Sequence, residues 1–107
     1  MASEELRASW KRTRNFLLES RAHFSEPAER VCRDQLKDFE IYLEQNELEL
    51  ALDMLEAAFE KSGVESWRVL ELMAMAAASM NLGDRQQRYD ARLSKARGGK
   101  YETLPPT

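Results

Sequence analysis

The sequence predicts an all-α fold, a compact bundle of four to five helices that forms a single domain over residues 1–97. Its 107 residues, 43% hydrophobic and 33% charged, provide room for one modest core. Apolar residues recur every three or four positions, whereas the strict alternation of a half-buried strand is nearly absent. Capping and stop residues divide this pattern into segments of helical length.

The first two helices are expected over about residues 3–24 and 26–45. Ser3 precedes two glutamates, as an N-cap does, and the face marked by Trp10 and Leu17 should be buried. A proline in a first helical turn loses no hydrogen bond, so Ser25 and Pro27 can start the second helix. The stripe expected to face inward there is Ala28, Val31, Cys32, Leu36, Phe39 and Leu43.

Three further helices follow a tight connection at Asn46, which has the spacing of a capping box with Glu49. The third helix, residues 47–62, should end at Gly63 in the left-handed conformation. The fourth helix begins after Ser66 and is apolar nearly all round over residues 69–80, so we expect it at the centre of the bundle. Asp84 opens a basic fifth helix, and residues 98–107 are expected to form a flexible C-terminal tail.

The sequence offers little for catalysis. His23 is the single histidine and Cys32 the single cysteine, and the four glycines form no phosphate-binding loop. We therefore expect no enzyme, no cofactor and no metal site. The chain starts without the features of a signal peptide and contains no apolar run long enough to span a membrane, so we expect a cytoplasmic protein that does not bind membranes.

Charge is concentrated in the middle of the chain. Residues 34–65 hold ten acidic residues and two lysines, a local net charge of −8 in a chain of −3. Four of these acids recur at i, i+4, i+7 and i+11 and should lie opposite the buried leucines of the third helix: Glu49, Asp53, Glu56 and Glu60. Such a row can steer a basic partner, although a merely solvated face explains it equally well. Tyr42, Leu50 and Met54 are candidate apolar anchors beside it, or core residues.

A resemblance to small bacterial immunity proteins of the Maf and contact-dependent growth inhibition type is carried by residues 41–55, IYLEQNELELALDML, and by an apolar helix that ends in SMNL at residues 79–82. The resemblance implies a helical protein that binds and neutralises a cognate toxin C-terminal domain, often a nuclease, inside the producing cell. An acidic face could cover the basic groove of such a toxin. The partner-binding residues would be Tyr42, Glu44, Glu47, Glu49, Asp53, Met54, Glu56 and Glu60.

Two alternatives stay open at this stage. A helical adaptor or chaperone-like module would fit the helix pairs, but tetratricopeptide units repeat every ~34 residues and no second copy is present. A nucleic-acid-binding regulator could use the basic last helix, which carries Arg85, Arg88, Arg92, Lys95 and Arg97. Only Tyr89 could stack on bases there, and pairing with the acidic middle of the chain explains these cations as well, so we expect no direct nucleic-acid binding.

Overall fold

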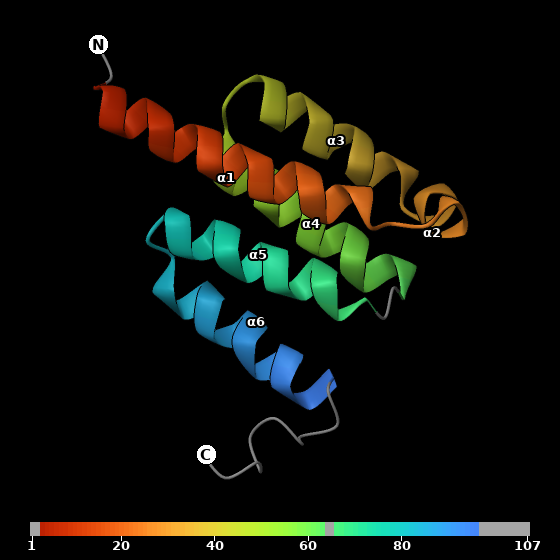
Figure 1. Ribbon diagram of the computed structural model, residues 1–107. Coiled ribbons are helices and arrows are strands. Elements are labelled where there is room, and N and C mark those ends of the chain that lie inside the picture. The colour runs from red at the N-terminus through yellow and green to blue at the C-terminus, as the bar shows by residue number, and fades with distance from the viewer. Residues whose placement is uncertain (1–2, 64–65, 97–107) are drawn as a thin grey trace, which may run out of the picture.

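The computed structural model describes residues 3–63 and 66–96, where all regular structure is helical. The helices are α1 (Glu4–Ala22), α2 (Glu26–Val31), α3 (Arg33–Glu44), α4 (Leu48–Ser62), α5 (Trp67–Ser79) and α6 (Gly83–Ala96) (Figure 1). The all-α prediction is confirmed, but the described residues contain six helices instead of four or five. The expected C-terminal tail, residues 98–107, and Arg97 lie outside the described residues.

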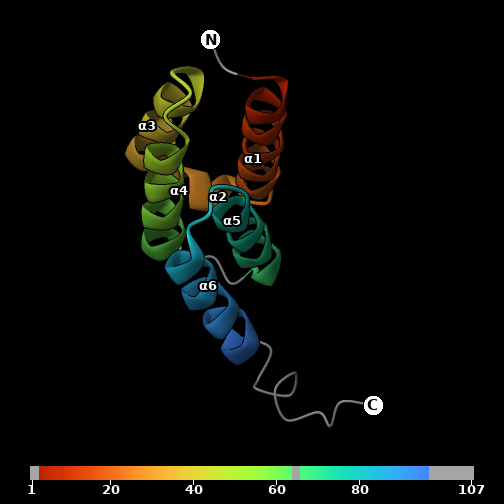
Figure 2. The same ribbon diagram turned by 90° about the vertical axis from the view of Figure 1, so that its left-hand side faces the viewer.

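The helices form two packed groups around one core. α3 pairs with α4, while α1 and α6 pack on either side of α5, which is therefore central as predicted (Figure 1). Figure 2 shows the α3–α4 pair beside the α1–α5 pair, and α4 closes the core between them through contacts with both α1 and α5. α5 is nevertheless not buried on every side, because Trp67 in its first turn and Met75 are exposed. None of the described helices is long and apolar enough to cross a bilayer.

The predicted second helix is interrupted at Cys32. This residue has φ −114° and ψ 32°, outside the α-helical region, so α2 ends and α3 begins there. Ala28, Cys32 and Leu36 follow one another at four-residue spacing and are buried, whereas Val31 is 51% exposed. The expectation that Val31 faces inward is therefore wrong, since the bend keeps only one of two adjacent stripes against the core.

Asn46 after α3 and Asn81 after α5 have the left-handed conformation. At Asn46 (φ 58°) the amide of Glu47 donates to the carbonyl of Tyr42 at 2.9 Å and that of Asn46 to Leu43 at 3.1 Å, which is a Schellman motif. The capping box expected between Asn46 and Glu49 is thus wrong, because Asn46 ends α3 and α4 begins without a side-chain cap. The caps predicted at Ser3 and Ser25 are confirmed: each hydroxyl accepts a backbone N–H, at 3.0 and 3.3 Å.

Small polar residues join α1 to α5. Thr13 Oγ1 and Ser79 Oγ are in hydrogen-bond contact at 2.6 Å, and the Ser20 hydroxyl donates to the carbonyl of Val69 at 3.2 Å. Thr13 and Ser20 are buried, so these bonds satisfy groups that water cannot reach. These bonds fix α1 on α5, while Arg14 and Leu18 on another side of α1 line a hollow that α1 shares with α3.

Candidate functional site

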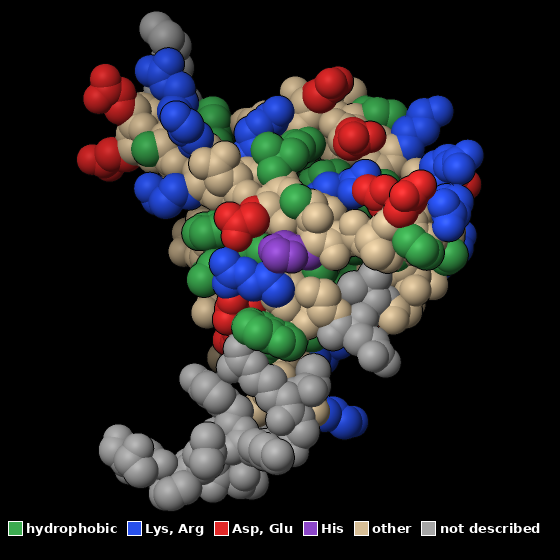
Figure 3. Space-filling model, turned by 45° about the vertical axis from the view of Figure 1, so that its right-hand side comes forward, with side chains coloured by type: hydrophobic (Ala, Val, Ile, Leu, Met, Phe, Trp, Pro, Cys, Tyr) green, Lys and Arg blue, Asp and Glu red, His purple; other side chains and the backbone are tan. Residues whose placement is uncertain are grey.

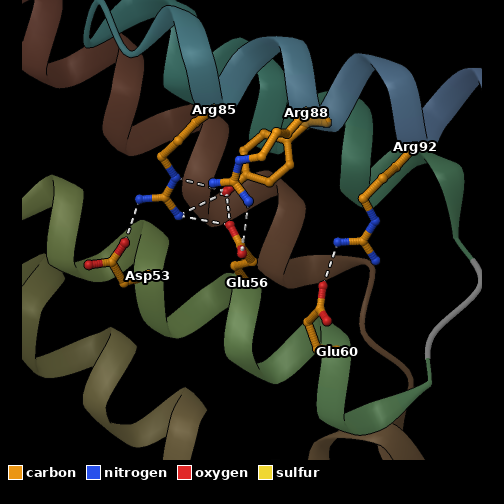
Figure 4. A network of polar contacts seen from close by, with 7 residues as sticks. Asp53, Glu56, Glu60, Arg85, Arg88 and Arg92 are labelled. Atoms are coloured by element: carbon orange, nitrogen blue, oxygen red, sulfur yellow. Dashed lines mark hydrogen bonds and ion pairs between the residues drawn. The ribbon is translucent and has the colours of Figure 1, made fainter.

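Three acids of α4 pair with three arginines of α6 (Figure 4). We call Asp53, Glu56 and Glu60 the acid row; Arg85 contacts the first two, Arg88 the second and Arg92 the third. Arg85 Nη2 lies 2.9 Å from Glu56 Oε1, Arg88 Nη1 lies 3.8 Å from Glu56 Oε2 and Arg92 Nη1 lies 2.5 Å from Glu60 Oε1. The acids follow one another at spacings of three and four residues, and so do the arginines, which places the two sets in register.

Glu56 is the centre of this network. The fully buried Tyr89 donates its hydroxyl proton to Glu56, and Arg85 Nη2 donates to the Tyr89 hydroxyl at 2.8 Å. Burial alone would raise the pKa of Glu56, but the hydrogen bonds from Tyr89 and Arg85 outweigh it and hold that pKa below its ordinary value. Burial and the neighbouring carboxylate raise the pKa of Tyr89. The cluster therefore keeps an ionised carboxylate and a protonated phenol together at neutral pH.

The expectation that the charged face of the third predicted helix is open to water is wrong for part of it. The side chains of Glu56 and Arg85 are only 22% and 15% exposed, because Arg85 and Tyr89 extend from α6 to this side of α4. Ion pairs with the basic last helix, one of the explanations that the sequence left open, account for the charges of Asp53, Glu56 and Glu60. Glu49, the first acid of the predicted stripe, is exposed and has no ion pair with a described residue.

A second group of acids remains on the surface. We call it the acidic surface: its members are exposed, form no ion pair within residues 3–63 and 66–96, and are Asp34, Asp38, Glu40, Glu44, Glu47 and Glu49. With Lys37 they give residues 34–49 a net charge of −5. On the face around the single histidine shown in Figure 3, acidic and basic side chains are interspersed. Six of the unpaired acids thus lie on α3 and its connection to α4, and the other four in the described part of the chain lie on α1 and α6.

Of the three candidate anchors, two pack against the core and one is exposed. Tyr42 and Met54 are half-buried and pack against the core cluster, whereas Leu50 is exposed. Of the eight residues predicted to bind a partner, Glu44, Glu47 and Glu49 lie together on the acidic surface. The other three acids belong to the acid row. The periodicity of the acids alone does not show this division, because it places both groups away from the buried leucines.

Within the described residues, no three His, Cys, Asp or Glu side chains are grouped closely enough to hold a metal ion. Glu40 and Glu44 lie one turn apart on α3 but have no third ligand of that kind beside them. No family model, curated protein or solved structure matches the chain. The function is therefore inferred from the charges and surfaces described above.

Proposed function

We propose that this protein is an immunity protein that binds a cognate bacterial toxin domain, a basic one, and neutralises it by one-to-one association in the producing cell. The observation that supports this proposal best is the acidic surface on α3 and the α3–α4 connection. Its carboxylates have no internal counter-ions among the described residues, in contrast to the acid row. A basic domain would supply these counter-ions.

The distribution of charge argues for a partner at this place. Asp34 and Asp38, like Glu40 and Glu44, stand four residues apart on α3, where like charges repel by roughly 0.2–0.5 kcal/mol per pair. The same chain supplies three arginines to the acid row and none to these six acids. An approaching basic surface would relieve this repulsion and be steered by the field, which raises association rates by roughly 10–1,000-fold at low salt.

Nucleic-acid binding is disfavoured by the arrangement of α6. Arg85, Arg88 and Arg92 already point to carboxylates of α4, so their charge is neutralised within the fold (Figure 4). A phosphate backbone would have to displace those carboxylates before it could use the arginines. A helical adaptor would also use protein contacts, but no observed feature favours it over the inhibitor.

A rescue selection tests the proposal. Genomic fragments from the source organism are expressed in a test bacterium with and without this protein, and fragments whose growth arrest is relieved only by the protein are purified with it. We expect a basic domain that forms a one-to-one complex in size-exclusion chromatography with light scattering. Selection of no such fragment, or rescue without a direct complex, would contradict the proposal.

Charge reversal then locates the surface. Glu44→Lys combined with Glu47→Lys should leave the circular dichroism spectrum unchanged, because both side chains are exposed and unpaired among the described residues. It should weaken the complex by at least about tenfold, since two attractive charges become repulsive. The matched control is Glu5→Lys with Asp90→Lys, which changes net charge equally at exposed positions on α1 and α6. Equal binding by the two double variants would show that only overall charge matters.

A further inference from the structure

A groove lies between α1 and α3, which do not pack against each other as a helix pair. It has a volume of about 440 Å³ and is lined from α1 by Arg14 and Leu18 and from α3 by Lys37, Glu40, Ile41, Leu43 and Glu44. A second hollow of about 390 Å³ shares Lys37 and Glu40 with it and continues toward α2. We call the two together the α1–α3 groove.

The middle of the groove is apolar and open. Leu18 from α1 and Ile41 from α3 are 43% and 42% exposed, and both line the same hollow. Two large aliphatic side chains that face one space from different helices form an anchor site for a third apolar side chain. Neither belongs to the core cluster, which contains Leu17 and Leu43 instead.

The two ends of the groove differ in charge. Glu40 and Glu44 flank Ile41 at the α3 C-terminal end, exposed and without ion pairs among the described residues. The end near α2 adds the ion pairs Arg21–Glu29 and Arg30–Glu26 and one arginine without an ion pair among the described residues, Arg33, so its added charge is positive. Lys37 lies between the two ends. The guanidinium of Arg14 lines the same hollow as Glu40 and Glu44 but forms no ion pair with these acids: its Nη1 donates to the carbonyl of Leu43 at 2.6 Å and so caps the end of α3.

We infer that the α1–α3 groove binds an amphipathic helix of the basic partner. A large apolar side chain of that helix enters between Leu18 and Ile41, and a lysine or arginine one turn later lies over Glu40 and Glu44. Helices carry acids near their N-termini and bases near their C-termini, so the charged ends of the groove orient the bound helix parallel to α3. The inference rests on the proposed function only in assigning this helix to the toxin domain.

A peptide selection tests the groove without the toxin. A phage library of helix-forming 16-residue peptides is selected on the protein and counter-selected on the Ile41→Ser variant, and enriched peptides are titrated by calorimetry. We expect a shared pattern of one large apolar residue followed three or four positions later by lysine or arginine. Methyl and amide NMR shifts on binding should centre on Leu18, Ile41 and Glu44.

Matched variants separate the groove from general hydrophobicity. Leu18→Ser and Ile41→Ser should each weaken peptide binding by about tenfold or more, as loss of an anchor contact does. Leu6→Ser on α1 and Leu50→Ser on α4 remove side chains of similar exposure, 45% and 42%, outside the groove and should change affinity less than about twofold. Circular dichroism and thermal melting check that all four variants stay folded.

Several outcomes would overturn the inference: no enrichment over the counter-selection, equal losses in the matched variants, or NMR shifts on another face. Self-association that Ile41→Ser abolishes would assign the groove to a second copy of the chain and would likewise refute it. The two proposals fail separately. If Ile41→Ser still neutralises the rescued toxin while Glu44→Lys with Glu47→Lys does not, the immunity function stands and the groove has another occupant.

Discussion

Replacement of Glu56 by glutamine should destabilise the fold far more than replacement of any exposed acid. Glutamine keeps the shape of the side chain but removes the charge that Arg85 and Arg88 face, and it disturbs the hydrogen bond that Tyr89 donates. Tyr89 is fully buried and cannot turn to water for a new acceptor. The substitution should therefore lower the free energy of unfolding by weakening the attachment of α6 to α4.

The magnitude follows from the burial of the pair. Exposed ion pairs contribute roughly 0–1 kcal/mol, whereas loss of one partner of a buried pair costs roughly 3–5 kcal/mol. The Glu56 and Arg85 side chains, 22% and 15% exposed, stand between these limits. Because Arg85 keeps its contact with Asp53, we expect a loss of about 2 kcal/mol and a fall in melting temperature of roughly 10 °C.

Urea unfolding followed by circular dichroism measures this loss, with Glu60→Gln and Glu44→Gln as controls. Glu60 meets only Arg92 at an exposed position, so its variant should lose less than about 1 kcal/mol, and Glu44→Gln should lose nothing measurable. The pKa of Glu56 is lowered by folding, so its carboxylate stabilises the protein above the ordinary pKa of 4.5 and ceases to do so as pH falls through the lower folded value. The difference between wild type and Glu56→Gln should therefore shrink in acid.

Two results would refute this account of the cluster. One is a loss in Glu56→Gln no greater than that in Glu60→Gln, which would mean that α6 is held by its contacts with α5 alone. The other is a difference from wild type that stays constant from neutral to acidic pH, since a charge effect must disappear when Glu56 is protonated.

Three further outcomes follow from the fold. Val31→Ser should change stability by less than about 0.5 kcal/mol while Leu36→Ala costs about 3 kcal/mol, and a reversed order in thermal melts would show that the chain does not bend at Cys32 as described. Asn46→Ala should cost about 1 kcal/mol in urea unfolding because alanine disfavours φ 58°, and an unchanged midpoint would contradict the Schellman motif. Gly63→Ala should cost a similar ~1 kcal/mol from the backbone alone, as nothing lies within 4 Å of the added methyl group; a gain in stability would exclude the left-handed conformation there.

The sequence predicted the helices and most of the buried faces because both depend on local spacing. Leu17 and Phe39 are fully buried where the three-and-four pattern placed them, and the caps at Ser3 and Ser25 form as expected. The break at Cys32 could not be predicted in this way, because the local spacing through Cys32 is that of a continuous helix. The backbone also keeps helical hydrogen bonds there: the amide of Cys32 donates to the carbonyl of Ala28 at 3.1 Å, and that of Leu36 to Cys32 at 3.0 Å. α2 and α3 each contact α4, and such contacts between helices cannot be predicted from the spacing within one segment.

The division of the acids shows why a charge pattern alone could not locate the proposed binding surface. Periodicity places Asp53 and Glu56 away from the leucines of α4, but it does not say whether solvent or another helix covers that side. The matching three-and-four spacing of Arg85, Arg88 and Arg92 was the available signal, and it gains meaning only once α6 lies beside α4.

The two groups of acids therefore predict different consequences of the same substitution. Reversal of charge at Asp53 or Glu56 would oppose Arg85 and release α6, so any loss of partner binding there would reflect loss of structure. Reversal at Glu44 or Glu47 meets no internal cation among the described residues and can act only through the field and contacts offered to a partner. Binding measured beside stability for both groups thus distinguishes a surface that contacts a partner from one that holds the bundle together.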